Sequence, residues 1–111
     1  MKKFEKWEIV LVKYPFTNLE KVKLRPALVL QQYKDDVIVF PITTKKTWYF
    51  LEIQESDLVE GNLLTKSYVK VSSVFTLDSK LILVAIAKLS ESKYNEIMWE
   101  FVTSILKFNI K

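Results

Sequence analysis

Two continuous apolar runs dominate the hydrophobic pattern in the first half of this chain. Residues 27–30 read ALVL and residues 37–40 read VIVF, with a polar break between them. Such runs predict two neighbouring buried strands joined by a turn. Arg25 precedes Pro26, and proline favours extended backbone at the residue before it while offering no N–H to a ladder. We therefore expect strands at 25–32 and 36–42, with Arg25 at the start of the first.

The remaining pattern predicts shorter strands and one helix. Strands are expected at 9–14, 48–53, 68–71 and 81–89, a helical turn at 55–59 and a tight connection at 74–78, while Gly61-Asn62 marks a turn. In the last segment apolar residues recur at helical spacing behind Ser90, a good N-cap: Tyr94, Ile97, Met98, Phe101, Val102, Ile105 and Leu106. Their stripe is expected to be core. The order of elements favours a mainly β domain, a small, strongly curved antiparallel barrel with a C-terminal helix.

Length and charge limit the class of protein. The 111 residues predict one domain, 1–111, that buries roughly two thirds of its unfolded surface. Half of the residues are apolar, a surplus that favours a subunit interface and hence a homodimer. The net charge of +4 favours an acidic partner, either RNA or an acidic protein segment.

Several classes of chemistry are excluded by absent residue types. Without cysteine or histidine there is no thiol nucleophile, imidazole base or histidine metal ligand, so no metal or cofactor is expected. A single glycine, Gly61, excludes glycine-rich phosphate loops. Residues 1–8 lack the apolar centre of a signal peptide, and residues 81–87 are too short to cross a bilayer. We expect a cytoplasmic protein without a membrane partner.

Polar residues meet where the two long strands begin and end. The Arg25 guanidinium at one strand's entrance can face the hydroxyls of Thr43 and Thr44 at its neighbour's exit. The alternatives are that Arg25 only pairs with a nearby carboxylate, and that Thr43 reflects β propensity alone.

Three motifs in this region also resemble a known family. EIVLVKYPFT, KLRPALVL and FPITTK follow one another as in the MazF/PemK/Kid-like toxins of bacterial type II toxin–antitoxin pairs. The resemblance continues more weakly through GNLLTKSYVKVSSVFTLD and AKLSES, from Trp7 to about the start of the last helix. It implies an SH3-like barrel, a homodimer, and sequence-specific cleavage of single-stranded mRNA without a metal. In that reaction the ribose 2′-hydroxyl attacks the adjacent phosphate, and a cognate antitoxin covers the RNA groove with an acidic segment.

The resemblance also implies roles for particular residues. The arginine of its RPxLV motif corresponds to Arg25, whose paired donors suit a phosphorane, and the threonine of its PIT motif corresponds to Thr43. Many members have Gly-Asp where this chain has Trp7-Glu8, which places an indole near the site and leaves Glu8 as the carboxylate.

A second departure concerns proton transfer. Some relatives have V-R-x-D where this chain has VKVS, so that Lys70 lacks the arginine fork and Ser72 cannot act as a carboxylate acid or base. The candidates for the base are Glu8, Lys70 and a water.

RNA recognition is expected to combine lysines with aromatic faces. The expected RNA-binding residues are Phe16, Thr17, Lys21, Lys23, Thr44, Lys45, Lys46, Trp48 and Ser72. The alternatives are that Trp48 belongs to the core and that Lys21 and Lys23 are simply solvated.

Two other functions are compatible with the sequence. One is a non-catalytic barrel that binds nucleic acid or a protein such as a topoisomerase, as CcdB-like toxins do, and Ser72 is the main argument for it. The other is a catalytically degenerate structural homodimer. No residue predicts the cleavage motif or the antitoxin's identity.

Overall fold

The computed structural model of this 111-residue chain describes residues 2–14, 23–46, 51–63 and 65–109. Within these ranges the chain forms eight strands, three short 3-10 helices and one α-helix. The strands are β1 (Glu8–Tyr14), β2 (Lys23–Tyr33), β3 (Asp36–Thr43), β4 (Leu51–Ile53), β5 (Leu58–Gly61), β6 (Ser67–Val69), β7 (Phe75–Asp78) and β8 (Ile82–Leu89). The 3-10 helices are η1 (Glu55–Asp57), η2 (Val71–Ser73) and η3 (Ser79–Leu81), and α1 spans Glu91–Asn109.

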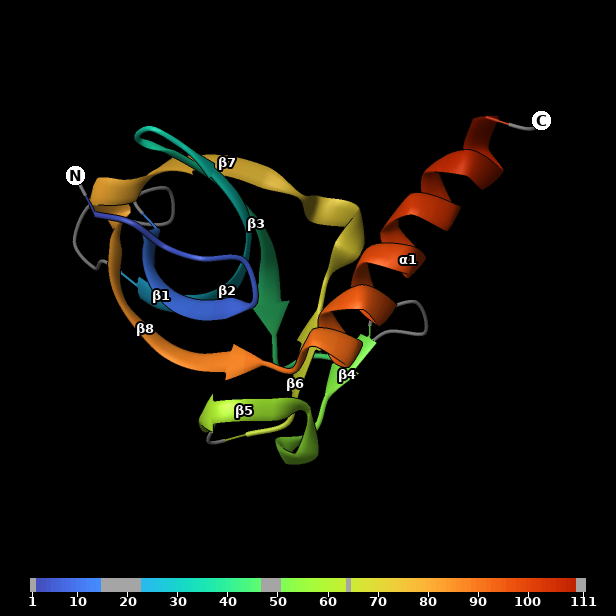
Figure 1. The fold of residues 1–111 in the computed structure, drawn as a ribbon, viewed down its shortest axis with the longest axis horizontal. Helices are drawn as coiled ribbons and strands as arrows, with labels where there is room; N and C mark the ends of the chain where they lie inside the picture. The colour runs from blue at the N-terminus through green and yellow to red at the C-terminus, as the bar shows by residue number, and fades with distance from the viewer. Residues whose placement is uncertain (1, 15–22, 47–50, 64, 110–111) are drawn as a thin grey trace.

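The strands form one antiparallel sheet that curls into a barrel (Figure 1). Their order is β4-β6-β3-β2-β1-β8-β5, and β7 pairs with β3 beside this path. The long strand β3 therefore has β2 along one edge, while β7 and β6 share the other edge. The predicted mainly β barrel with a C-terminal helix is confirmed.

Two apolar clusters explain why β2 and β3 read as continuous apolar runs. Successive side chains of a strand point to opposite faces. Val29 and Val39 belong to a cluster that also contains Val10 of β1, whereas Leu28 and Phe40 belong to a second cluster that reaches α1. All five of these side chains are fully buried, so both faces of the central strands are covered.

The helix begins and packs as predicted over its first half. The N–H of Lys93 donates to the Ser90 hydroxyl at 3.2 Å, which confirms Ser90 as the N-cap. The Tyr94 hydroxyl donates to the Leu30 carbonyl at 3.4 Å, and the Phe101 ring meets Phe40 edge to face with centroids 5.1 Å apart.

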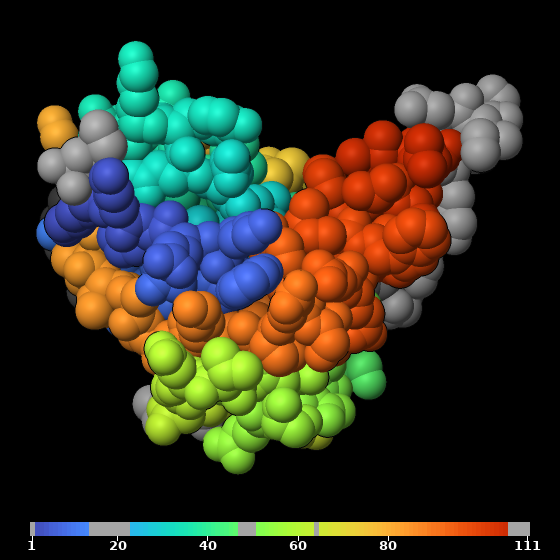
Figure 2. All heavy atoms as spheres, viewed as in Figure 1, coloured from blue at the N-terminus to red at the C-terminus, as the bar shows by residue number. Residues whose placement is uncertain are grey.

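The second half of the apolar stripe is not core within the described part of the chain. Val102, Ile105 and Leu106 are 44%, 45% and 53% exposed, and Trp99 on the same helix is 70% exposed. Figure 2 shows why, because α1 projects away from the barrel toward its C-terminal end. The prediction that the whole stripe is core is therefore wrong for these residues.

The prediction that Arg25 starts its strand is wrong. β2 begins at Lys23, and Pro26 lies inside it, opposite Leu11 of β1. Among the described residues, β3 pairs with β2 only from Ala27 onward, so at Pro26 a single ladder is present. A proline, which has no N–H to donate, is tolerated at such an edge position.

Two short strands were not predicted. Residues 75–78 form β7 rather than a tight connection, and residues 58–61 form β5. The last two residues of the helical turn predicted at 55–59 therefore belong to β5. The turn itself is confirmed as η1. In the strand predicted at 68–71, the last residue, Val71, instead begins η2. For the strand expected at 48–53, residues 51–53 form β4 and 48–50 lie outside the described residues. Within the described ranges, no helix has the length and apolar character needed to span a bilayer.

Candidate functional site

A cleft of about 860 Å³ lies where β2 enters the sheet and β3 leaves it. The first residues of β2 pair with β1, and the last residues of β3 pair with β6, so the two strands part at this end. The cleft is lined by Leu11, Arg25, Pro26, Ile42, Thr43, Thr44, Lys45, Asn62, Leu63, Thr65, Ser67 and Ile86.

Strand register brings Arg25 and Thr43 to the same face of the sheet. The β2–β3 ladder runs through Leu28–Phe40 to Ala27–Pro41. Side chains two positions apart on a strand share a face, so Arg25 and Thr43 lie on the same face as the paired residues Ala27 and Pro41. Both residues line the cleft, as expected from the ends of the two strands.

Arg25 is the only arginine of the sequence, whereas all other cationic side chains are lysines. Its side chain is exposed, as are Thr44 and Lys45 beside it. Thr43 is half-buried, and its Oγ1 accepts a hydrogen bond from the N–H of Lys45 at 3.1 Å. This turn holds the β3 exit and sets the orientation of the Thr43 hydroxyl.

The cleft has the charge of an anion-binding site. Arg25 and Lys45 are its cationic lining residues, and no carboxylate is among the described residues that line it. Nor do the described residues contain a group of three or more side chains able to hold a metal ion. Hydrogen-bond donors beside fixed positive charge can bind a phosphate directly.

The structure does not bring Glu8 to this cleft. Its carboxylate accepts a hydrogen bond from the N–H of Glu5 at 2.7 Å, which closes the turn before β1. Arg25 pairs with Val12, four residues further along β1, and such a stretch of strand covers roughly 13 Å.

The indole of Trp7 is not near the site either, contrary to expectation. Trp7 has φ = 82°, so the backbone keeps the left-handed conformation that glycine adopts without strain. Its ring packs edge to face on Tyr94, with centroids 6.0 Å apart, and Lys6 and Lys88 lie over it at 5.5 and 5.9 Å. These contacts tie Trp7 to the helix side of the barrel.

Several other predicted residues are not among those that line the cleft. The N–H of Lys70 donates to the Pro41 carbonyl at 3.0 Å and extends the β6–β3 ladder by one residue. Since Tyr68 faces Thr43, Lys70 is a diagonal neighbour of Thr43 on the same face, at a typical separation of roughly 7–8 Å. Ser72, in η2, is exposed, and so are Lys23 and Lys46. Phe16, Thr17, Lys21 and Trp48 lie outside the described residues.

Sequence reasoning missed the contribution of the segment between β5 and β6. Asn62, Leu63 and Thr65 line the cleft together with Ile86 of β8. The Gly61-Asn62 dipeptide indicated a turn at this point, but no local pattern showed that the turn borders Arg25.

Fold and cleft together define a small antiparallel barrel with a basic cleft at the strand ends. The model of the PemK-like, MazF-like toxins of type II toxin–antitoxin systems matches residues 5–103. The chain belongs to this family and is a toxin of that kind, which confirms the resemblance found in its motifs.

Solved structures share the fold. A mycobacterial endoribonuclease solved with its cognate antitoxin is 16% identical, with a TM-score of 0.73 over 95% of each chain. The Mycobacterium tuberculosis toxin MazF-mt6 is 19% identical, with a TM-score of 0.69 over 90% of this chain and 96% of that one. A further mycobacterial endoribonuclease is 17% identical, with a TM-score of 0.68 over 91% and 90%. No curated protein sequence gives a significant match.

Proposed function

We propose that this toxin is an endoribonuclease that cleaves single-stranded RNA, without a metal ion, in the cleft between Arg25 and Thr43. The observation that carries the proposal is that the chain's one guanidinium, a threonine hydroxyl and Lys45 line the same cleft. Family membership and the endoribonucleases of the same fold support it.

The reaction follows from the ribose itself. The 2′-hydroxyl oxygen attacks the adjacent phosphorus, the bond from phosphorus to the 5′-oxygen breaks, and the products are a 2′,3′-cyclic phosphate and a 5′-hydroxyl. Negative charge accumulates on the non-bridging oxygens in the transition state, where Arg25 can donate two parallel hydrogen bonds. Because the Thr43 oxygen accepts from Lys45, its own hydrogen can point to the phosphate.

Proton transfer is assigned by position. Glu8 is bonded to the turn at the other end of β1, so it has no part in this proposal. Lys70 is a diagonal neighbour of Thr43, and we place it as the donor of a proton to the leaving 5′-oxygen. A water in the open cleft accepts the proton of the 2′-hydroxyl.

Two protein partners complete the proposal. A toxin of a type II pair has an antitoxin, and an acidic segment of that partner would match the cleft's positive charge. The exposed apolar residues Val102, Ile105 and Leu106 at the end of α1 provide a surface for a second copy of the chain.

The test is cleavage of a long, unstructured RNA by the purified protein in EDTA, with fragment ends mapped by sequencing. Arg25→Gln removes the guanidinium, and Lys34→Gln removes one positive charge from the exposed turn at the far end of β2. Both variants are first compared with wild type by circular dichroism. We expect cuts at a short recurring sequence for wild type and Lys34→Gln, and none for Arg25→Gln.

Intact RNA with wild type, at several salt concentrations, would contradict the proposal. Specific RNA binding without cleavage would then favour the non-catalytic barrel, which the absence of a carboxylate from the described cleft lining also favours. Equal loss of cleavage in Lys34→Gln and Arg25→Gln would show a general charge effect rather than a role for the cleft.

A further inference from the structure

The cleft has two chemically different sides. Arg25 and Lys45 place positive charge at the β2 entrance and the β3 exit. Asn62, Leu63 and Thr65 form a side without charge among the described residues, next to Ile86 of β8. Because β5 pairs with β8 and β6 pairs with β3, Asn62 follows β5 at one flank of the cleft and Thr65 precedes β6 at the other.

A nucleotide likewise has one charged part and one uncharged part. Its phosphate is anionic, whereas its base is an uncharged flat ring with hydrogen-bond donors and acceptors along the edges. A phosphate on the Arg25 side leaves the attached base to face an amide, a hydroxyl and two apolar side chains. The cleft volume of about 860 Å³ lies within the range of small-ligand pockets, roughly 300–1,000 Å³.

We propose that Asn62 determines the cleavage sequence by hydrogen bonding to the edge of a base next to the scissile phosphate. This inference rests on the endoribonuclease function proposed above. The Asn62 amide carries both donors and an acceptor, so it can form two hydrogen bonds with one base edge and discriminate against the others. Thr65 adds a hydroxyl on the same side, and Leu63 and Ile86 provide the apolar contact for the ring.

Gly61 fixes the backbone immediately before Asn62. It pairs with Ala87 of β8 and has φ = +72°, a conformation that side chains rarely adopt. A Cβ added here would clash with the Ile86 carbonyl oxygen and would lie 2.8 Å from the Ala87 Cα. Only glycine lets β5 approach β8 this closely, and the approach holds Asn62 at the cleft.

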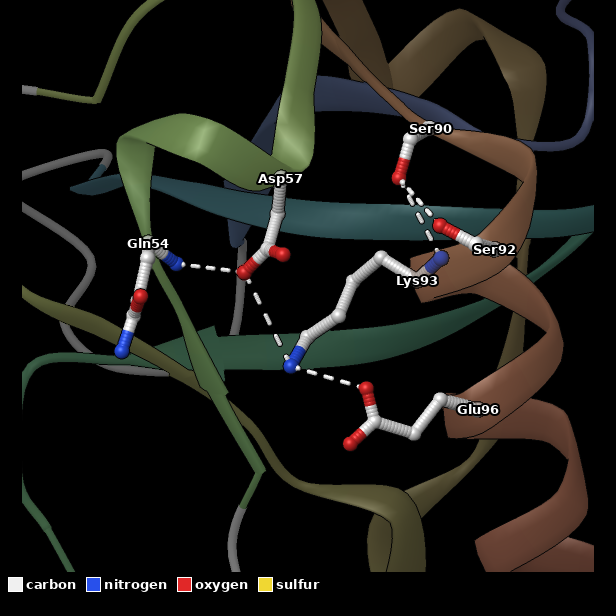
Figure 3. A network of polar contacts seen from close by, with 6 residues as sticks. All are labelled: Gln54, Asp57, Ser90, Ser92, Lys93 and Glu96. Atoms are coloured by element: carbon white, nitrogen blue, oxygen red, sulfur yellow. Dashed lines mark hydrogen bonds and ion pairs between the residues drawn. The ribbon is translucent and has the colours of Figure 1, made fainter.

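Polar contacts fix the beginning of the same strand (Figure 3). The Asp57 carboxylate, which precedes β5, accepts from the N–H of Gln54 at 2.8 Å and lies 3.7 Å from the Lys93 ammonium of α1. The N–H of Ser90 donates to the Asp57 carbonyl at 2.7 Å. Contacts with α1 hold η1, and pairing with β8 holds Gly61, so the backbone that leads to Asn62 is fixed at both points. A side chain on a fixed backbone is suited to discriminate between bases.

The experiment compares the cleavage sites of wild type, Asn62→Ala and Asn95→Ala in one pool of random-sequence RNA in EDTA. Asn95 is exposed on α1 and does not line the cleft, so its variant is the same chemical change elsewhere. We expect Asn62→Ala to lose about tenfold discrimination at one position of the motif, the scale of one bidentate contact to a base. Asn95→Ala should keep the wild-type motif.

All proteins are checked for cooperative unfolding. If Asn62→Ala is unfolded, Asn62→Leu, which keeps the side-chain volume and removes the amide, takes its place: relaxation at one motif position supports the inference, and an unchanged motif overturns it. If folded Asn62→Ala cuts the wild-type motif with unchanged discrimination, the inference is wrong while the endoribonuclease proposal stands. If wild type cuts no RNA, the endoribonuclease proposal fails and the base-reading role fails with it.

Discussion

At the scale of single residues, Arg25 has the clearest physical reason for its identity. Every other cationic side chain is a lysine, and the one arginine lines the cleft, where we propose that its two parallel donors meet a phosphate. Arg25→Lys keeps the charge and removes the fork, so we expect the cleavage rate to fall by roughly 100-fold, the typical cost of one transition-state donor. The measurement is the initial rate on a labelled oligoribonucleotide that contains the mapped site, and a rate within twofold of wild type would contradict the role.

Tyr94 gives a prediction about pH. Burial raises the pKa of its hydroxyl above 10.0, so unfolding releases a tyrosine that ionises more easily than the folded one. The contribution to stability is fully present below pH 10 and is lost as pH rises through the folded pKa. Tyr94→Phe also loses the hydrogen bond to the Leu30 carbonyl, which costs about 1 kcal/mol near neutral pH.

Urea unfolding of wild type and Tyr94→Phe at pH 8 and at pH 11 measures this effect. All other side chains are common to the two proteins, so the difference between the two free energies of unfolding isolates Tyr94. We expect that difference to shrink at pH 11. A difference of the same size at both pH values would show that the hydroxyl titrates alike in the folded and unfolded chain.

At the scale of elements, the long strands were predictable and the short ones were not. The apolar runs within β2 and β3 are buried on both faces, and burial of both faces requires consecutive apolar residues, which the sequence shows directly. β5 is four residues long and mostly exposed, so its apolar pattern is too weak to distinguish it from a turn. It exists because β8, more than twenty residues later, offers a ladder, and pairing at that distance leaves no local trace.

The candidate site divides in the same way. Arg25 lies near the start of β2, and Thr43, Thr44 and Lys45 lie at or just beyond the end of β3. Proline and strand-end patterns therefore indicated that these residues share one cleft. Asn62 and Thr65 reach the cleft only through the β5–β8 and β3–β6 pairings, which the sequence does not display. Glu8 was expected at the cleft from its match to a carboxylate in the family pattern, but its distance from Arg25 is set by the β1–β2 register, which the sequence does not display.

A substitution at Gly61 tests how closely β5 approaches β8. Gly61→Ala combines a side chain at φ = +72° with a clash against the backbone of β8, so we expect a loss of roughly 1–3 kcal/mol in the free energy of unfolding. Thermal and urea unfolding measure it, with Ser56→Ala in the exposed η1 as the control. Equal stability of Gly61→Ala and wild type would contradict the close approach of β5 to β8.

At the scale of the whole molecule, α1 carries apolar side chains that are exposed in the described part of the chain. Leu106 is 53% exposed near the end of the helix, and Leu83 of β8 is 40% exposed on the barrel. If α1 joins two copies of the chain, Leu106→Asp should shift the mass measured by light scattering toward the monomer, whereas Leu83→Asp should not. A wild-type monomer, or a Leu106→Asp protein with the wild-type mass, would contradict this assembly.

The central claim is that a 2′-hydroxyl attacks the phosphate held by Arg25 and Thr43. The most direct measurement uses two synthetic oligoribonucleotides containing the mapped site, one all-ribose and one with a single 2′-deoxy sugar before the scissile phosphate, in EDTA. We predict that the first gives a 2′,3′-cyclic phosphate by mass spectrometry and that the second stays intact at that bond. Cleavage of the deoxy-substituted bond would show that another nucleophile attacks, and it would contradict the account.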